Sequence, residues 1–179
     1  MDATDALIAR LPEHAADLGY DLAKVLGETR LTAAQRWGCA LASALALRDR
    51  ALAEAFGADA RAAQVPEATV EDARAAAALM GMNNVYYRFV EALGGDYATL
   101  PAALRMKRVA RPASSKADFE LFALAVSALN GCDACMRHHE QKGRAAGLEP
   151  LLLRDGVRVA AAVRGTSVAL WDSTLGASV

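Results

Sequence analysis

The chain has 179 residues, of which 54% are apolar and 23% are charged, and its formal net charge is -1. This composition belongs to a folded domain with a hydrophobic core and excludes an intrinsically disordered chain. A net charge near zero gives no electrostatic footprint for nucleic acid or for an anionic membrane surface. We therefore expect one domain, residues 1–179, that binds neither nucleic acid nor a membrane.

Residue usage favours helices over strands. Aromatic residues make up 6% of the chain and Ile8 is the sole isoleucine, whereas sheets draw on β-branched and aromatic side chains. The first residues are acidic and interrupted by Arg10 and Pro12, unlike a secretory signal. The uncharged run at 37–47 is too short to span ~30 Å of hydrocarbon. We predict an all-α protein in a reducing cytoplasm, where cysteines serve redox or metal chemistry more often than structural disulfides.

The first two long helices are predicted from capping signals. Thr32 begins a capping-box pattern, TAAQ, ahead of an apolar run that closes at Gly57. Thr69 with Asp72 opens the next helix, EDARAAAALMGMNNVYYRFVEAL, which a pair of glycines stops.

Three further helices follow in the second half of the chain. Ser115 begins one that ends at an Asn-Gly pair, and the next starts at or just before Cys132 and fades by Gly147. The last runs over residues 149–172.

Short matches at one spacing predict an internal repeat. Ser-Ala-Leu occurs at 43–45 and 127–129, and Gly81 matches Gly165 at the same spacing of 84 residues. We expect two pseudo-repeat halves, residues 30–95 and 114–179. At this spacing the reactive groups of the second half have no reactive counterpart in the first: Cys132, Cys135, His139 and Glu120 correspond to Arg48, Ala51, Ala55 and Arg36.

The stretch NGCDACMRHHE carries the chemistry. If Cys132 lies in the first turn of a helix, Cys135 at i+3 shares its face, and His139 lies at i+4 from Cys135. A helix start favours a thiolate, and a Cys-x-x-Cys thiol can have a pKa well below ~8.5. A histidine beside the sulfur can take the thiol proton and protonate an alkoxide that leaves a hydroperoxide. Glu120 in the preceding helix can orient that imidazole if the two helices fold back on each other.

Spacing alone leaves other uses of the cysteines open. Both cysteines with His138 or His139 can be three ligands of a structural zinc, although no second paired motif supplies the usual fourth ligand. Covalent haem attachment requires a histidine where the chain has Met136, and a thioredoxin domain requires strands. We expect His138 at the surface and Cys39 as an inert core thiol.

Asn83 and Asn84 lie within a predicted helix, where asparagine lowers helix propensity. A packing or interface role accounts for the pair better than catalysis does.

The stretch FELFALAVSALNGCDACMRHHE resembles the alkylhydroperoxidase D (AhpD) family of the carboxymuconolactone decarboxylase-like superfamily. RWGCALASALAL and MGMNNVYYRF extend the resemblance over nearly the whole chain. Its specific pattern is Glu, eleven residues, Cys-x-x-Cys, three residues and His, which Glu120, Cys132, Cys135 and His139 fill. The resemblance implies an AhpD-like helical bundle with a two-fold pseudo-repeat, assembled as a homotrimer.

The resemblance also implies an antioxidant enzyme, a lipoyl-dependent peroxidase that reduces organic hydroperoxides to alcohols. Cys135 would be the peroxidatic residue that becomes a sulfenic acid, and Cys132 the resolving, proton-donating residue of a redox-active disulfide. Glu120 and His139 would form the proton relay. The implied electron donor is a lipoyl dithiol on a dihydrolipoamide acyltransferase, which Cys132, nearer the helix tip, is better placed to meet.

The implied partner is an AhpC-type peroxiredoxin, which the enzyme reduces in turn, and no metal, haem or flavin is required. Some family members carry a histidine directly before the second cysteine, where this chain has Ala134. Peroxidase turnover is therefore expected to be weaker. The alternatives are a thiol-disulfide adaptor with little peroxidase activity and a non-enzymatic, zinc-stapled helical protein.

Overall fold

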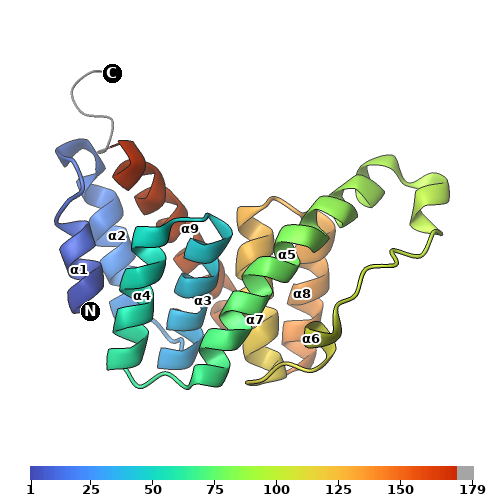
Figure 1. Ribbon diagram of the computed structural model, residues 1–179, viewed down its shortest axis with the longest axis horizontal. Helices are drawn as coiled ribbons and strands as arrows, with labels where there is room; N and C mark the ends of the chain where they lie inside the picture. Colours follow the sequence, from blue (N-terminus) through green and yellow to red (C-terminus); the bar gives the residue numbers. More distant parts are fainter. Residues whose placement is uncertain (173–179) are drawn as a thin grey trace.

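The computed structural model describes residues 1–172; residues 173–179, the end of the expected second half, lie outside the described part. Within that part the protein is built from helices (Figure 1) and no strand occurs, which confirms the all-α prediction. No helix in residues 1–172 combines the length and apolar character that a membrane span requires. The elements are α1 (Asp2–Ile8), η1 (Glu13–Ala15), α2 (Ala16–Gly27), α3 (Ala33–Ala46), α4 (Arg50–Ala62), α5 (Glu67–Leu93), η2 (Gly95–Ala98), α6 (Lys107–Ala110), α7 (Lys116–Leu129), α8 (Asp133–Ala145) and α9 (Pro150–Asp172).

The apolar run after Thr32 forms two helices, α3 and α4, and the prediction of one helix up to Gly57 was wrong. Thr32 does cap α3 through a capping box, as predicted. Asp49 begins α4, because its Oδ1 accepts a hydrogen bond from the Leu52 N–H at 3.0 Å. Arg48 joins the helices with a φ of 58°, which is uncommon outside glycine. Three charged residues, 48–50, interrupt the apolar run, and the Asp49 side chain begins a new helix there by accepting the backbone N–H three residues further on.

Helix α5 begins directly after Pro66, four residues before the predicted start at Glu71. Thr69 and Asp72, which were predicted to open it, lie inside the helix and are buried. Asp72 accepts a hydrogen bond from Arg108 Nε at 2.8 Å, and from two backbone N–H groups just before α7. This carboxylate anchors the connection between α5 and α7 instead of capping a helix.

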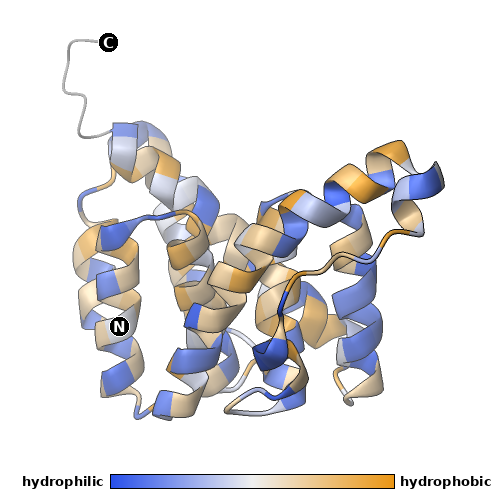
Figure 2. Cartoon of the chain, turned by 45° about the vertical axis from the view of Figure 1, so that its right-hand side comes forward, coloured by the Kyte–Doolittle hydropathy of each residue, from blue (hydrophilic) through white to orange (hydrophobic). Residues whose placement is uncertain are grey.

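Four long helices form the centre of the molecule. Helix α3 packs against α5, α7 and α9, and α7 also packs against α8, while α1 and α2 lie at the opposite end from α8 (Figure 1). The second half of α5 extends beyond the body with η2 at its tip, and the chain returns from there to α6 (Figure 1). Hydrophobic residues are spread along this extension (Figure 2), and Val85, Phe89 and Leu93 are exposed on it.

The helices of the two halves begin at a spacing of 83 residues instead of the expected 84. Helix α3 starts 83 residues before α7, and the same spacing separates α4 from α8 and α5 from α9. Cys132, the N-cap of α8, therefore corresponds to Asp49, the N-cap of α4, and the expected match to Arg48 was wrong by one residue. Matches of one to three residues in an alanine-rich chain are too short to fix the register. At the observed spacing, Glu120 and His139 correspond to Trp37 and Phe56, whose ring centroids lie 6.2 Å apart.

Gly131, in the turn between α7 and α8, has a φ of 63°, and an added Cβ would meet no atom of residues 1–172 within 4 Å. Gly131→Ala therefore tests backbone strain alone and should lower the free energy of unfolding by about 1 kcal/mol. Gly81→Ala, inside α5 and equally unobstructed, is the matched control and should raise it by about 0.5–1 kcal/mol. Urea unfolding measures both, and effects of the same sign would contradict this description of the turn.

Candidate active site

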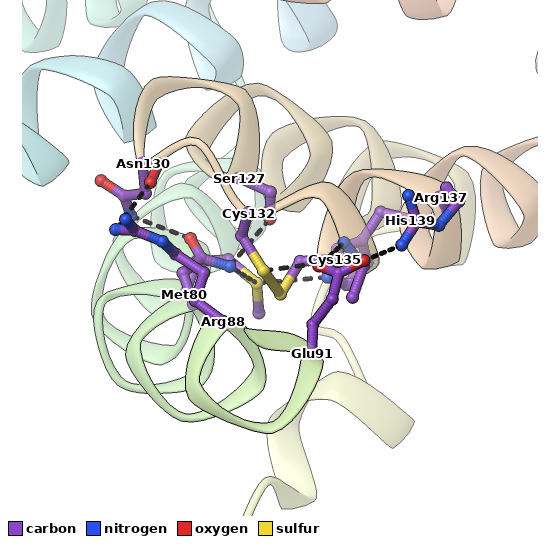
Figure 3. The surroundings of a disulfide bond; sticks show 11 residues. Met80, Arg88, Glu91, Ser127, Asn130, Cys132, Cys135, Arg137 and His139 are labelled. Atoms are coloured by element: carbon purple, nitrogen blue, oxygen red, sulfur yellow. Dashed lines mark hydrogen bonds and ion pairs between the residues drawn. A yellow bond between two sulfur atoms is a disulfide. The ribbon is translucent and has the colours of Figure 1, made fainter. Parts of the chain in front are cut away.

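Two cysteines occupy the start of α8. Cys132 is the N-cap, where its Sγ accepts a hydrogen bond from the Cys135 N–H at 3.3 Å. A disulfide bond joins the two residues (Figure 3). The helix start agrees with the sequence prediction within one residue. Cys135 occupies the third helical position, where the helix dipole favours a negative charge on its sulfur.

A cavity of about 570 Å³ opens beside Cys135. Cys135 lines it and is 5% exposed, whereas Cys132 is covered, at 0%. The expectation that Cys132 is better placed to meet an external dithiol was therefore wrong, because an N-cap side chain folds over the start of its own helix. Most of the surface that lines the cavity is apolar, and two lysines also line it. The lining residues are Asn83, Tyr87, Met106, Val109, Ala110, Lys116, Glu120, Ala134, Cys135, His138, His139 and Lys142.

Glu120 and His139 meet in the wall of this cavity. The Nδ1–H of His139 donates to Oε2 of Glu120 at 2.6 Å, and both side chains are buried. Helices α7 and α8 fold back at the Asn-Gly turn, which brings these residues together as the sequence analysis required. Because an ionised carboxylate only accepts hydrogen bonds, Nδ1 carries the hydrogen and Nε2 is left to accept a proton.

Lys116 lies on the other side of the Glu120 carboxylate, and the sequence analysis missed it. Its Nζ is 2.6 Å from Oε1 of Glu120 and donates to the Val109 carbonyl at 2.8 Å. Burial would raise the pKa of Glu120, but the hydrogen bond from His139 and the ammonium of Lys116 outweigh burial and hold that pKa below its ordinary value. The carboxylate is therefore ionised at neutral pH. Lys116 precedes Glu120 by four residues on one helix, a spacing that could have identified it.

The second ring nitrogen of His139 faces α5. Nε2 lies 3.2 Å from the Sδ of Met80 (Figure 3), which is fully buried. In residues 1–172 no hydrogen bond joins His139 to a cysteine sulfur, although the helical spacing suggested a direct approach to Cys135. Both residues line the same cavity. A proton that passes between them therefore crosses that cavity.

Glu91 fastens α5 to the start of α8. Its Oε2 accepts a hydrogen bond from the Ala134 N–H at 3.0 Å, and its carboxylate pairs with Arg137 (Figure 3). A negative charge at a helix N-terminus is stabilised by the dipole. No local sequence pattern links Glu91 to a residue 43 positions away.

Two residues that the sequence analysis set aside are placed as predicted. His138 is exposed, although it also lines the cavity, and its ring meets that of His139 edge-on with centroids 5.2 Å apart. Cys39 is fully buried, and burial raises the pKa of its thiol. Within the described residues, no group of three or more His, Cys, Asp or Glu side chains is arranged to hold a metal ion.

Known proteins are similar to this chain in sequence. The carboxymuconolactone decarboxylase family matches residues 95–173, which include both cysteines. Alkyl hydroperoxide reductase AhpD of Anaeromyxobacter dehalogenans strain 2CP-1 is 53% identical over 171 residues, which cover 95% of this chain and 91% of the relative. The AhpD proteins of Maricaulis maris and Gluconacetobacter diazotrophicus are 46% and 43% identical, over 93% of this chain and 96% and 91% of their own. The chain therefore belongs to the AhpD family, as the motif predicted.

The lowered pKa of Glu120 predicts a pH dependence of stability. A carboxyl group with a lower pKa in the folded state stabilises the protein above its unfolded pKa of about 4.3, and this contribution is lost as pH falls through the folded value. Glu120→Gln should lower the free energy of unfolding by about 2 kcal/mol at neutral pH. The difference from wild type should shrink in acid.

Urea unfolding between neutral pH and about pH 3 measures this difference. Glu140→Gln, which removes an exposed carboxylate of α8, is the matched control and should change stability by less than about 0.5 kcal/mol. A difference between wild type and Glu120→Gln that stays constant over the whole range would contradict the assignment.

Proposed function

We propose that this protein is an antioxidant alkyl hydroperoxide reductase, which reduces organic hydroperoxides to alcohols through Cys132 and Cys135. The observation that carries the proposal is the buried Glu120–His139 pair in the wall of the cavity that Cys135 lines. This arrangement offers a sulfur nucleophile, a base and a space for substrate in one place. Relatives that are up to 53% identical bear the name alkyl hydroperoxide reductase AhpD.

The first step of the proposed reaction oxidises Cys135. Its thiol passes a proton across the cavity to Nε2 of His139, and the ionised Glu120 stabilises the imidazolium that forms. The thiolate attacks the terminal oxygen of the hydroperoxide, so an S–O bond forms while the O–O bond breaks. The leaving alkoxide takes the proton back from His139. The products are the alcohol and a Cys135 sulfenic acid.

The second step closes the disulfide. The Cys132 sulfur attacks the Cys135 sulfenic acid, and the hydroxyl leaves as water with the proton that Cys132 gives up. The two Cα atoms lie 5.2 Å apart, within the range that a disulfide bond spans. We assign Cys132 as the resolving, proton-donating residue, and its covered position, which keeps it away from the peroxide, supports this assignment.

The proposed electron donor is the lipoyl dithiol of a dihydrolipoamide acyltransferase. One donor thiolate attacks the sulfur of Cys135, which lines the cavity, and forms a mixed disulfide while Cys132 is released. The second donor thiol then displaces Cys135, which leaves two cysteine thiols and an oxidised lipoyl group. We also propose that the protein passes electrons to an AhpC-type peroxiredoxin, assembles as a homotrimer and acts in the cytoplasm. These proposals rest on its membership of the AhpD family.

A thiol-disulfide adaptor with little peroxidase activity is the second candidate. Two observations favour it: Ala134 replaces the histidine of some family members, and His139 Nε2 faces Met80 instead of a cysteine sulfur. In an adaptor the disulfide exchanges with the partner, and direct peroxide turnover is slow. Peroxide turnover measured with and without the peroxiredoxin separates the two functions.

Reaction of the reduced protein with one equivalent of cumene hydroperoxide tests the peroxidase function. Wild type should lose two hydrogens and two thiols, by intact mass and thiol titration. Cys132→Ser should stop at a Cys135 sulfenic acid that dimedone traps, and Cys135→Ser should form no sulfenic acid. Cys39→Ser, which removes the buried core thiol, is the control and should behave as wild type.

Normal peroxide consumption by Cys135→Ser would contradict the assignment of roles. Unchanged mass in wild type would favour the adaptor or the zinc-stapled protein. One zinc per chain after purification without chelator would identify the latter.

A further inference from the structure

Two neighbouring asparagines of α5 have different surroundings. The Nδ2 of Asn84 donates to Ser127 Oγ at 3.1 Å, and its Oδ1 accepts from Asn130 Nδ2 at 2.8 Å, which confirms the expected packing role for Asn84. Asn83 is also buried, at 6% exposed, but it lines the cavity beside Cys135. Within the described residues its Oδ1 has no hydrogen-bond partner, and no hydrogen bond engages its NH2 group.

An amide oxygen buried without a partner costs about 1–3 kcal/mol, so native proteins seldom keep such a side chain without a use for it. Because Oδ1 of Asn83 is buried, Nδ2 is the amide atom left to face the cavity, and it can donate hydrogen bonds. Met80 lies three residues earlier on the same face of α5, and its Sδ contacts His139 Nε2. Asn83 therefore lines the same cavity as the base and the nucleophile, and within the described residues no hydrogen bond uses its donor.

We propose that Asn83 is a catalytic residue, whose side-chain NH2 donates a hydrogen bond to the peroxide oxygen that leaves as an alkoxide. This inference rests on the proposed peroxidase function. When the Cys135 thiolate bonds to the terminal oxygen and the O–O bond breaks, the sulfur loses two electrons and the peroxide gains them. Negative charge then develops on the oxygen bound to carbon. A donor already fixed at that place stabilises the transition state without reorganisation.

This role divides the work at the leaving oxygen between two residues. Asn83 stabilises the charge as it develops, and His139 supplies the proton that completes the alcohol. The packing or interface role expected from the sequence accounts for Asn84, but it assigns no hydrogen-bond partner among residues 1–172 to the amide of Asn83.

The test compares two reactions of Cys135, in a Cys132→Ser parent so that oxidation stops at the sulfenic acid. Oxidation by cumene hydroperoxide expels an alkoxide and needs the donor, whereas alkylation by iodoacetamide expels iodide and does not. Asn83→Leu has a similar size and cannot donate a hydrogen bond. Asn83→Asp keeps the shape and an acceptor but, when ionised, has no donor.

We expect Asn83→Leu to slow oxidation about 10–100-fold while alkylation stays within about twofold of the parent. Asn83→Asp should lower the ratio of oxidation to alkylation to a similar extent. The added negative charge slows both reactions, whereas loss of the hydrogen-bond donor slows only the oxidation. Asn84→Leu is the matched control: it should lower thermal stability and leave the ratio unchanged, as expected of a residue that only packs.

Two results would overturn the inference, and they differ in what else they overturn. In the first result, the parent forms the sulfenic acid and the Asn83→Leu protein keeps the parent's ratio of oxidation to alkylation. This result contradicts the role of Asn83 but not the peroxidase function. A parent whose Cys135 is alkylated by iodoacetamide but never oxidised by the hydroperoxide overturns the peroxidase function, and the role of Asn83 with it.

Discussion

A carboxylate in a protein core is stable only if other groups compensate its charge, and the site depends on how this is done for Glu120. His139 donates to one oxygen and the Lys116 ammonium lies against the other. Of these two contacts, the one with His139 joins α7 to α8 and holds the imidazole in one orientation. Together the two contacts keep the carboxylate ionised, which is the state that stabilises an imidazolium. One buried charge thus serves both the packing of the helices and the chemistry proposed for them.

The cysteines use a position that an ordinary helix pair already provides. At the spacing of 83 residues, the N-cap of α4 is Asp49, whose carboxylate accepts the Leu52 N–H at 3.0 Å. The N-cap of α8 is Cys132, whose sulfur accepts the Cys135 N–H at 3.3 Å. With a sulfur in place of the carboxylate, the N-cap still accepts a backbone hydrogen bond of the first helical turn. It also lies within disulfide-bonding distance of Cys135, the third residue of α8. The capping role also explains why Cys132 is covered and why Cys135 faces the cavity.

Local patterns predicted the helices wherever the deciding contact is local. The caps at Thr32 and Ser115 and the turn before Cys132 involve residues within a few positions of one another, and the sequence shows them. Residues that depend on tertiary packing were missed, because Met80 and Glu91 reach the site from α5, far away in the sequence. Glu120 and His139 were found because one tight turn joins their helices. The register of the halves was wrong because short matches in an alanine-rich sequence cannot fix it, and the split between α3 and α4 was missed although the charged residues 48–50 mark it.

The central claim is that Glu120 acts through His139 on the reactivity of Cys135. The most direct test is the rate of Cys135 alkylation by iodoacetamide between pH 5 and 10, in Cys132→Ser protein with and without Glu120→Gln. With Glu120 present, the rate should rise with a midpoint below the ~8.5 of a free thiol, because the ionised carboxylate stabilises an imidazolium near the thiolate. Glu120→Gln should move the midpoint up toward that value. Identical pH profiles for the two proteins would contradict the account.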